Sequence, residues 1–184
     1  MPIDMKNVIS NTLVEMARKK GIDKITVKAL IDACHISRQT FYYHFQDLME
    51  VIEWTMEQAM QEILEKSLRA ETPEEVLKIL ISFAMENRTL ICKLLDSQKR
   101  EQMERLFVQA AKTYLQELLR NKSHGYSLSY YSLNYSDMDV ALDFLSYGIT
   151  GILFQCCRQN QVDVEKLAQQ ICRLLPQKTE PDIS

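Results

Sequence analysis

Side chains suited to recognising another molecule are concentrated in one short run, RQTFYYH, from Arg38 to His44. An Arg can donate two hydrogen bonds to a guanine and a Gln can pair in the same way with an adenine, while Thr and Tyr hydroxyls can bind phosphates. Tyr42, Tyr43 and His44 are consecutive, so they cannot all face inward from a helix. The run therefore favours a contact surface for nucleic acid over an ordinary buried helix face.

Two short helices joined by a tight turn would position this run. Thr26 and Ser37 each stand where a hydroxyl can cap a helix start, and His35 stands where the chain must reverse between the helices. Phe41 and Phe45 are four residues apart, so their rings can be buried together and hold the opposite face outward. A short helix that is anchored on one face and polar on the other suits the major groove of DNA.

A resemblance to a known family rests on these residues. The segment TVKALIDACHISRQTFYYHF, residues 26–45, resembles the helix-turn-helix signature of the TetR family of bacterial transcription regulators. The match covers roughly the first 45 residues, and the rest of the chain is similar to the family in length and helical layout. The apolar helix that contains Gly148 and Gly151, followed by a short last helix, resembles the branch with regulators of dihydroxyacetone kinase genes.

The resemblance implies a role and a set of contact residues. It implies a homodimer that binds a palindromic operator in double-stranded DNA, with no cofactor. Base contacts would come from the second helix of the pair, with Lys28 reaching from the first helix. The expected DNA-binding residues are Thr26, Lys28, Arg38, Gln39, Thr40, Tyr42, Tyr43 and His44.

Three positions depart from the family pattern. His35 replaces the usual Gly at the turn, and His tolerates the left-handed backbone better than most residues. Leu48 replaces a Lys that binds phosphate, so we expect one ionic contact fewer per subunit and a shallower salt dependence. Ile31 replaces a small residue in the first helix of the pair, which implies different packing between the two helices. Base recognition should persist with weaker ionic attraction.

Composition and charge agree with a helical DNA-binding protein. The 184 residues are 46% hydrophobic and include four Gly and four Pro, which favours a compact, mostly helical chain. The net charge is −3, yet residues 1–46 hold seven Lys and Arg against four acidic residues, which suits a DNA-reading end on an acidic body. Arg18, Lys19 and Lys20 close the first expected helix, where they either favour its dipole or touch phosphates.

Helical periodicity predicts an all-α protein with about nine helices. A first helix from Asp4 to Lys20 and the capped pair would make a three-helix head over residues 1–46. A long helix from Asp47 to about Ala70 would connect this helix-turn-helix head to a helical bundle over residues 47–176, used for effector binding and dimerisation. Residues 177–184 are expected to form a flexible tail.

Residues 121–136 differ from the rest of the chain, since NKSHGYSLSYYSLNYS is polar and aromatic without a helical period. We expect a loop there, and a short strand is conceivable. The interpretation that we prefer is a surface connection whose rings pack on neighbouring helices. The alternative is the wall of a ligand pocket, with ligand-binding residues Tyr114, Tyr126, Tyr130 and Tyr131.

The last two expected helices, Met138–Cys157 and Val164–Leu175, suggest a second subunit. The first is apolar on every side, so it has to be covered on every side. Two helices from each chain would form an intermolecular four-helix bundle, as in TetR-like proteins. The apolar run is broken by polar residues, and we expect it to be too polar and too short to span a membrane. The expected dimer residues are Phe144, Gly148, Gly151, Ile152, Leu167 and Ile171.

Catalysis and metal binding have little support in the sequence. It contains three His, no Gly-rich phosphate loop, no nucleophile elbow and no H-E-x-x-H. The five Cys form no C-x-x-C pair and favour buried thiols in a reducing cytoplasm, and the N-terminus has no signal segment. We therefore expect a cytoplasmic regulator whose operator affinity responds to a small-molecule effector. Two alternatives stay open: a regulator that acts through a protein co-factor, and a helical enzyme or ligand carrier with a vestigial head.

Overall fold

The computed structural model describes residues 4–121, 135–159 and 161–174, and these residues contain helices but no strand. The expected all-α class, with a helix-turn-helix head and a helical body, is confirmed. A short 3-10 turn, η1 (Ile22–Lys24), joins the first two helices. The α-helices in the described residues are α1 (Met5–Lys20), α2 (Val27–Cys34), α3 (Arg38–His44), α4 (Leu48–Arg69), α5 (Pro73–Glu86), α6 (Arg88–Leu95), α7 (Arg100–Asn121), α8 (Tyr135–Cys157) and α9 (Val164–Leu174).

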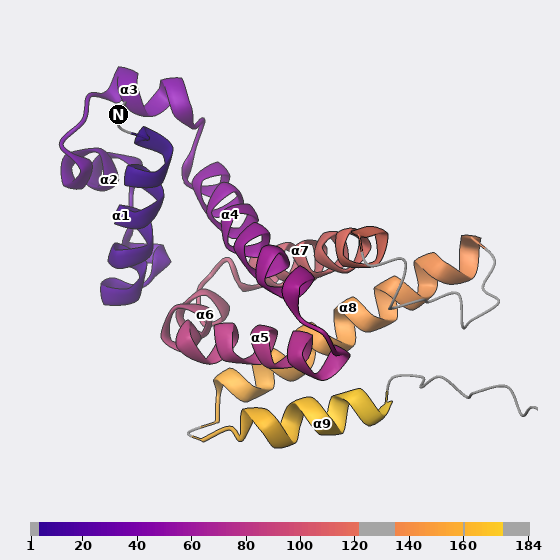
Figure 1. Cartoon of the computed structure of the whole chain (residues 1–184). Helices are drawn as coiled ribbons and strands as arrows, with labels where there is room; N and C mark the ends of the chain where they lie inside the picture. The colour runs from indigo at the N-terminus through magenta and orange to yellow at the C-terminus, as the bar shows by residue number, and fades with distance from the viewer. Residues whose placement is uncertain (1–3, 122–134, 160, 175–184) are drawn as a thin grey trace, which may run out of the picture.

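The long helix α4 connects the two parts of the molecule (Figure 1). Helices α1, α2 and α3 gather at one end, and α4 runs from them into a body made by α5 to α9. In the body, α5 packs against α9, and α7 packs against both α4 and α8. At about 1.5 Å per residue, α4 is a rod roughly 33 Å long, and it joins the head to the body.

Apolar residues at helical spacing hold the head together. Ile9 and Leu13 of α1, Leu30 of α2 and Phe41 of α3 are buried in one cluster. That cluster does not stop at the head, because it continues through Val51 and Ile52 of α4, Leu94 of α6 and Met103 of α7. One apolar cluster therefore spans the junction of the head and the body, and we call it the head core.

Local caps fix where the helices around the head begin and end. Asp4 caps α1 by accepting a hydrogen bond from the Asn7 N–H, and α1 ends at Gly21, where φ is 79°. At the start of α4, Asp47 accepts a hydrogen bond from the Glu50 N–H at 3.0 Å. The Glu50 carboxylate accepts in turn from the N–H of the residue before Asp47. Asp47 thus caps α4, and the return bond from Glu50 goes to the residue before the cap, one residue earlier than in a capping box.

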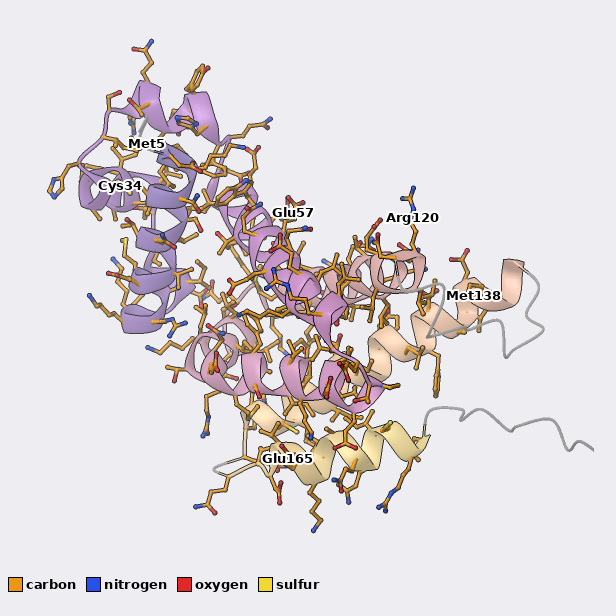
Figure 2. The ribbon with its side chains drawn as sticks, viewed as in Figure 1. Met5, Cys34, Glu57, Arg120, Met138 and Glu165 are labelled. Carbon is orange, nitrogen blue, oxygen red and sulfur yellow. The ribbon has the colours of Figure 1, made fainter. Side chains whose placement is uncertain are left out.

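Helix α5 lies at the centre of the body and is covered on several sides. Val76 and Leu80 pack with residues of α4 and α7. Leu77 and Ile81 pack with residues of α8 and α9, and Ala84 belongs to a cluster with α6 and α8. Side chains fill the space between these helices (Figure 2), so the arrangement of the body is set by apolar burial around α5.

Helix α8 differs from the expectation in two respects. It begins at Tyr135 rather than at Met138, so the end of the expected 121–136 loop is helical. Met138–Cys157 also has the length and composition of a membrane-spanning helix, with a mean hydropathy of 1.5, so the expectation that this run is too polar and short was wrong. The helix packs on α5, α6 and α7, and its Asp143 forms an ion pair with Lys112 of α7 at 2.6 Å.

Candidate nucleic-acid interface

Helix α3 is anchored to the rest of the molecule on one face. Ser37 caps it, because its hydroxyl accepts a hydrogen bond from the Thr40 N–H at 3.0 Å. Phe41 and Phe45 are fully buried, and their ring centroids lie 6.3 Å apart. The Phe45 ring also meets the Trp54 ring of α4 edge-on, at 6.0 Å. The predicted burial of the two Phe side chains is confirmed, and it fixes α3 against the head core and α4.

The opposite face of α3 is open to solvent. Arg38 and Gln39 are exposed, and Tyr42 and Tyr43 are exposed over 54% and 85% of their surface. His44 is half-buried, and its ring meets the Tyr43 ring edge-on at 5.0 Å. Helix α3 lies at the far end of the head, and side chains on its outer side project away from the body (Figure 2). The structure thus brings these five expected DNA-binding residues to one surface, which we call the α3 face.

Two of the other expected contact residues hydrogen-bond at the starts of helices. The Thr26 hydroxyl accepts a hydrogen bond from the Ala29 N–H at 3.1 Å and so caps α2. The Thr40 hydroxyl lies 2.8 Å from the Ser37 hydroxyl. Lys28 is exposed in the first turn of α2, beside the helix end whose amides attract anions. This placement brings a cation and the positive end of a helix dipole to the same side of the head.

The turn between α2 and α3 has the left-handed backbone that the sequence predicted. His35 has φ 54° and ψ 40°, and it is the single residue other than Gly with a positive φ in the described part of the chain. The reversal is closed by hydrogen bonds from the His35 N–H to Asp32 O and from the Ile36 N–H to Ile31 O, each at 3.3 Å. A side chain in this conformation costs roughly 1 kcal/mol or more relative to Gly, so the turn keeps its shape under some strain.

The first residue of α4, Leu48, is half-buried against the head core. A different cation lies nearby, because the Nζ of Lys6 in α1 is 5.1 Å from the Phe45 ring centroid. The same Nζ is 5.9 Å from the Trp54 ring centroid, so the ammonium group is held by cation–π attraction at the base of α3. No spacing in the sequence points to Lys6, since only the fold brings the start of α1 next to the end of α3.

Three of the expected dimer residues lie on one side of α8. Phe144 is exposed over 76% of its surface, and Gly148 and Gly151 are exposed at the next turns of the helix. A Cβ added to either Gly would meet no atom within 4 Å, so packing inside the chain does not require Gly there. Val140 and Tyr147 are exposed beside them. We call these five residues the α8 face.

The other three expected dimer residues are more covered within the single chain. Ile152 and Leu167 are half-buried. Ile171 is exposed over only 7% of its surface, because it packs with Leu77 and Ile81 of α5. The structure therefore does not bring Ile171 to the α8 face, and its side chain has little surface left for a partner.

A small cavity lies inside the body between α4, α5, α6, α7 and α8, with a volume of about 60 Å³. Tyr114, one of the four expected ligand residues, lines it. The Tyr114 hydroxyl donates a hydrogen bond to the Ser67 hydroxyl at 2.7 Å, and burial raises the pKa of Tyr114 to about 12. Tyr126, Tyr130 and Tyr131 lie outside the described residues. Most of the lining is apolar, including Phe83, Phe107, Leu153 and Phe154.

Solved structures show a similar fold. The dihydroxyacetone kinase operon activator DhaS aligns with a TM-score of 0.67 and 20% identity over 94% of both chains. A protein from Listeria innocua aligns with a TM-score of 0.71 and 17% identity over 95% of this chain and 93% of the other. A TetR transcriptional regulator from Streptococcus agalactiae 2603V aligns with a TM-score of 0.64 and 21% identity over 92% of both chains. No curated protein matches the sequence.

Two family models match different parts of the chain. Residues 9–50 match the model described as bacterial regulatory proteins of the tetR family. Residues 71–177 match the model described as the C-terminal region of transcriptional regulators. The first match contains the α3 face, and the second begins just after α4. Together with the shared fold, these matches show that the chain belongs to the TetR family of bacterial transcriptional regulators.

Proposed function

We propose that this protein is a cytoplasmic, sequence-specific DNA-binding regulator that binds a palindromic operator as a homodimer. The α3 face carries the proposal, because it presents Arg38 and Gln39 on a short helix that is anchored from behind. Each good bidentate contact from such side chains to a base is worth about 1–3 kcal/mol of discrimination. Residues 1–46 would form the reading head and residues 47–176 the dimerisation and effector region.

The test is operator binding by the full chain, measured by fluorescence anisotropy with the DNA upstream of its own gene and with scrambled DNA. Gln39→Ala and Tyr42→Ala should each weaken specific binding by roughly 5- to 150-fold, while binding to scrambled DNA changes little. Gln61→Ala is the matched control, because Gln61 is exposed on α4 away from α3. Unchanged specific binding in both α3 variants would sink the proposed role of this face.

Dimerisation through the α8 face is part of the same proposal. Phe144 and Val140 offer apolar area to a partner, and Gly148 and Gly151 allow a second helix to approach closely. A dimer is needed to place two reading helices in successive major grooves, about 34–36 Å apart. The helices α8 and α9 of two chains would form the four-helix bundle, with the heads at the opposite end of the molecule.

The cavity in the body is the proposed effector site, and its lining limits the effector to small, uncharged, apolar molecules. The Tyr114 hydroxyl is engaged with Ser67, and the Cys157 thiol donates to Ala84 O at 3.6 Å. An effector would have to part Phe107 from Phe154, whose ring centroids lie 5.2 Å apart. Titrating the operator complex with small hydrocarbons and alcohols tests this, since only the apolar members should release DNA.

The small cavity also favours a second candidate, a regulator controlled by a protein co-factor. Sites for drug-sized ligands commonly enclose about 300–1,000 Å³, whereas this cavity encloses about 60 Å³. If no small molecule changes operator affinity, and a stable protein partner is recovered with the intact dimer, the co-factor proposal is preferred. The family consists of regulators rather than enzymes. If Arg38→Ala abolishes the protein's regulatory activity, the alternative of an enzyme or carrier with a vestigial head loses its support.

A further inference from the structure

Helix α6 (Arg88–Leu95) lies between the head and the body and contributes to two apolar clusters. Leu94 belongs to the head core, whereas Ile91 and Leu95 belong to a cluster with Cys157 of α8. Ile91 also lines the body cavity. Because this eight-residue helix packs against the head on one side and against α8 on the other, the position of the head relative to α8 depends on α6.

Lys93 extends from α6 to the end of α1. Its Nζ donates hydrogen bonds to the main-chain carbonyls of Arg18 and Lys19, the second at 3.0 Å. These carbonyls belong to the last turn of α1, where they have no partner within the helix and form the negative end of its dipole. Lys93 is half-buried, so its ammonium group caps the C-terminus of α1 from another helix.

Two further polar contacts join the head to the two ends of α6. Before α6, the Arg18 guanidinium donates to Asn87 Oδ1 at 2.6 Å. After α6, the Gln98 N–H donates to the Asp23 carboxylate at 3.0 Å. Arg18 therefore faces the body in this structure, and of its two expected roles the contact with phosphate is the less supported. Together the three contacts restrain how α1 can rotate over α6.

We propose that Lys93 is a positioning residue for DNA recognition, which fixes the orientation of each head on the body by capping α1. This inference rests on the proposed operator binding by a dimer. The reading helices of the two heads have to match half-sites at a set spacing. A head that turns on the body would place α3 at a variable distance from the α3 of the partner, and selectivity for spacing would fall.

The first experiment compares the wild-type chain with Lys93→Met, which keeps the aliphatic stem and removes the donors. Affinity is measured for operators whose spacing is native, or shorter or longer by one and two base pairs. Lys93→Met should lose about tenfold in affinity at the native spacing, as expected when hydrogen bonds to a charged group are removed. It should lose little at the altered spacings, so that selectivity for spacing falls. A general loss of folding would instead lower binding at every spacing alike.

Two control variants separate charge from position. Lys66→Met removes one positive charge from an exposed site on α4, where Lys66 pairs with Glu62 of the same helix. It should keep the wild-type selectivity for spacing. Lys93→Arg keeps a cation and its donors at the cap and should restore most of the selectivity.

A second experiment reports head orientation without DNA. Spin labels are attached through unnatural amino acids at Asn11 of α1 and Glu101 of α7, both exposed. Lys93→Met should broaden the distribution of distances between the labels. An unchanged distribution together with unchanged selectivity for spacing would overturn the role of Lys93 while leaving operator binding intact. If no variant binds any operator, the proposed function fails, and the distance distribution alone decides whether Lys93 holds the head.

Discussion

The α3 face and the α8 face both expose aromatic side chains, but they differ in what surrounds those side chains. On α3, Tyr42 and Tyr43 carry hydroxyls and stand beside Arg38 and Gln39, while Phe41 holds the helix from behind. On α8, Phe144 is accompanied by Val140, Tyr147 and two Gly, and the face contains no Arg, Gln or His. The comparison shows that exposed aromatic area alone does not identify a partner. Polar neighbours indicate a charged and hydrated partner such as DNA, and apolar neighbours indicate another protein surface.

Removing the anchor of α3 should have the largest effect. Phe41→Ala deletes a fully buried ring from the head core and should lower the free energy of unfolding by about 3–5 kcal/mol. Tyr43→Ala, two residues along the same helix, should change it by about 0.5 kcal/mol or less, because Tyr43 is exposed. Urea denaturation of the two variants measures the difference. Equal losses would mean that α3 does not have one buried and one exposed side.

Placing an Asp on each of the two exposed faces should weaken binding to a different partner in each case. Phe144→Asp places a charge on the α8 face and should raise the dissociation constant of the dimer by at least about 30-fold, as for an interface hot spot. Tyr43→Asp should leave the dimer intact and weaken DNA binding instead. Analytical ultracentrifugation over a range of concentrations tests this. A dimer that withstands Phe144→Asp would place the interface elsewhere.

Adding a cation where α4 begins should strengthen the α3 face selectively. Leu48→Lys should restore a phosphate contact and make the slope of log affinity against log salt concentration steeper by about 0.9 for each subunit. Gln61→Lys adds the same charge farther along α4 and serves as the control. Anisotropy titrations between low and physiological salt give the two slopes. If both variants give the same slope, position 48 does not contact phosphate.

Relaxing the turn before α3 should have the smallest effect. His35→Gly removes the strain of a left-handed side chain and should raise the free energy of unfolding by about 0.5–1 kcal/mol. Ala33→Gly, in the last turn of α2, has no such strain to relieve and should lower stability by up to about 1 kcal/mol. Thermal and urea denaturation both report the change. A loss of stability in His35→Gly would show that the His side chain stabilises the turn.

The features that the sequence predicted well are set by residues close together in the chain. Thr26 and Ser37 cap the helices that they were expected to cap, because a cap depends on three or four neighbouring residues. The burial of Phe41 and Phe45 followed from helical spacing for the same reason. These local rules were sufficient to predict the α3 face.

The features that the sequence did not predict depend on contacts between distant segments. Lys93 meets the end of α1 across 75 residues of chain, and no spacing rule relates the two. Ile171 lies on an apolar stripe, but a stripe does not say whether α5 or a second subunit covers it. The start of α8 was placed three residues late, because the polar composition before Met138 shows no helical period.

The continuous head core limits how freely this protein can exchange parts with its relatives. Leu94 and Met103 lie in the head core although they come from α6 and α7, so a fragment ending at residue 46 would leave Ile9 and Phe41 partly uncovered. In a chimera that carries only a new reading head on this body, the new head would therefore not fit the residues of the body that face it. Successful grafting should require the facing residues of α4, α6 and α7 to be transplanted with the head, so operator specificity and body sequence are expected to evolve together.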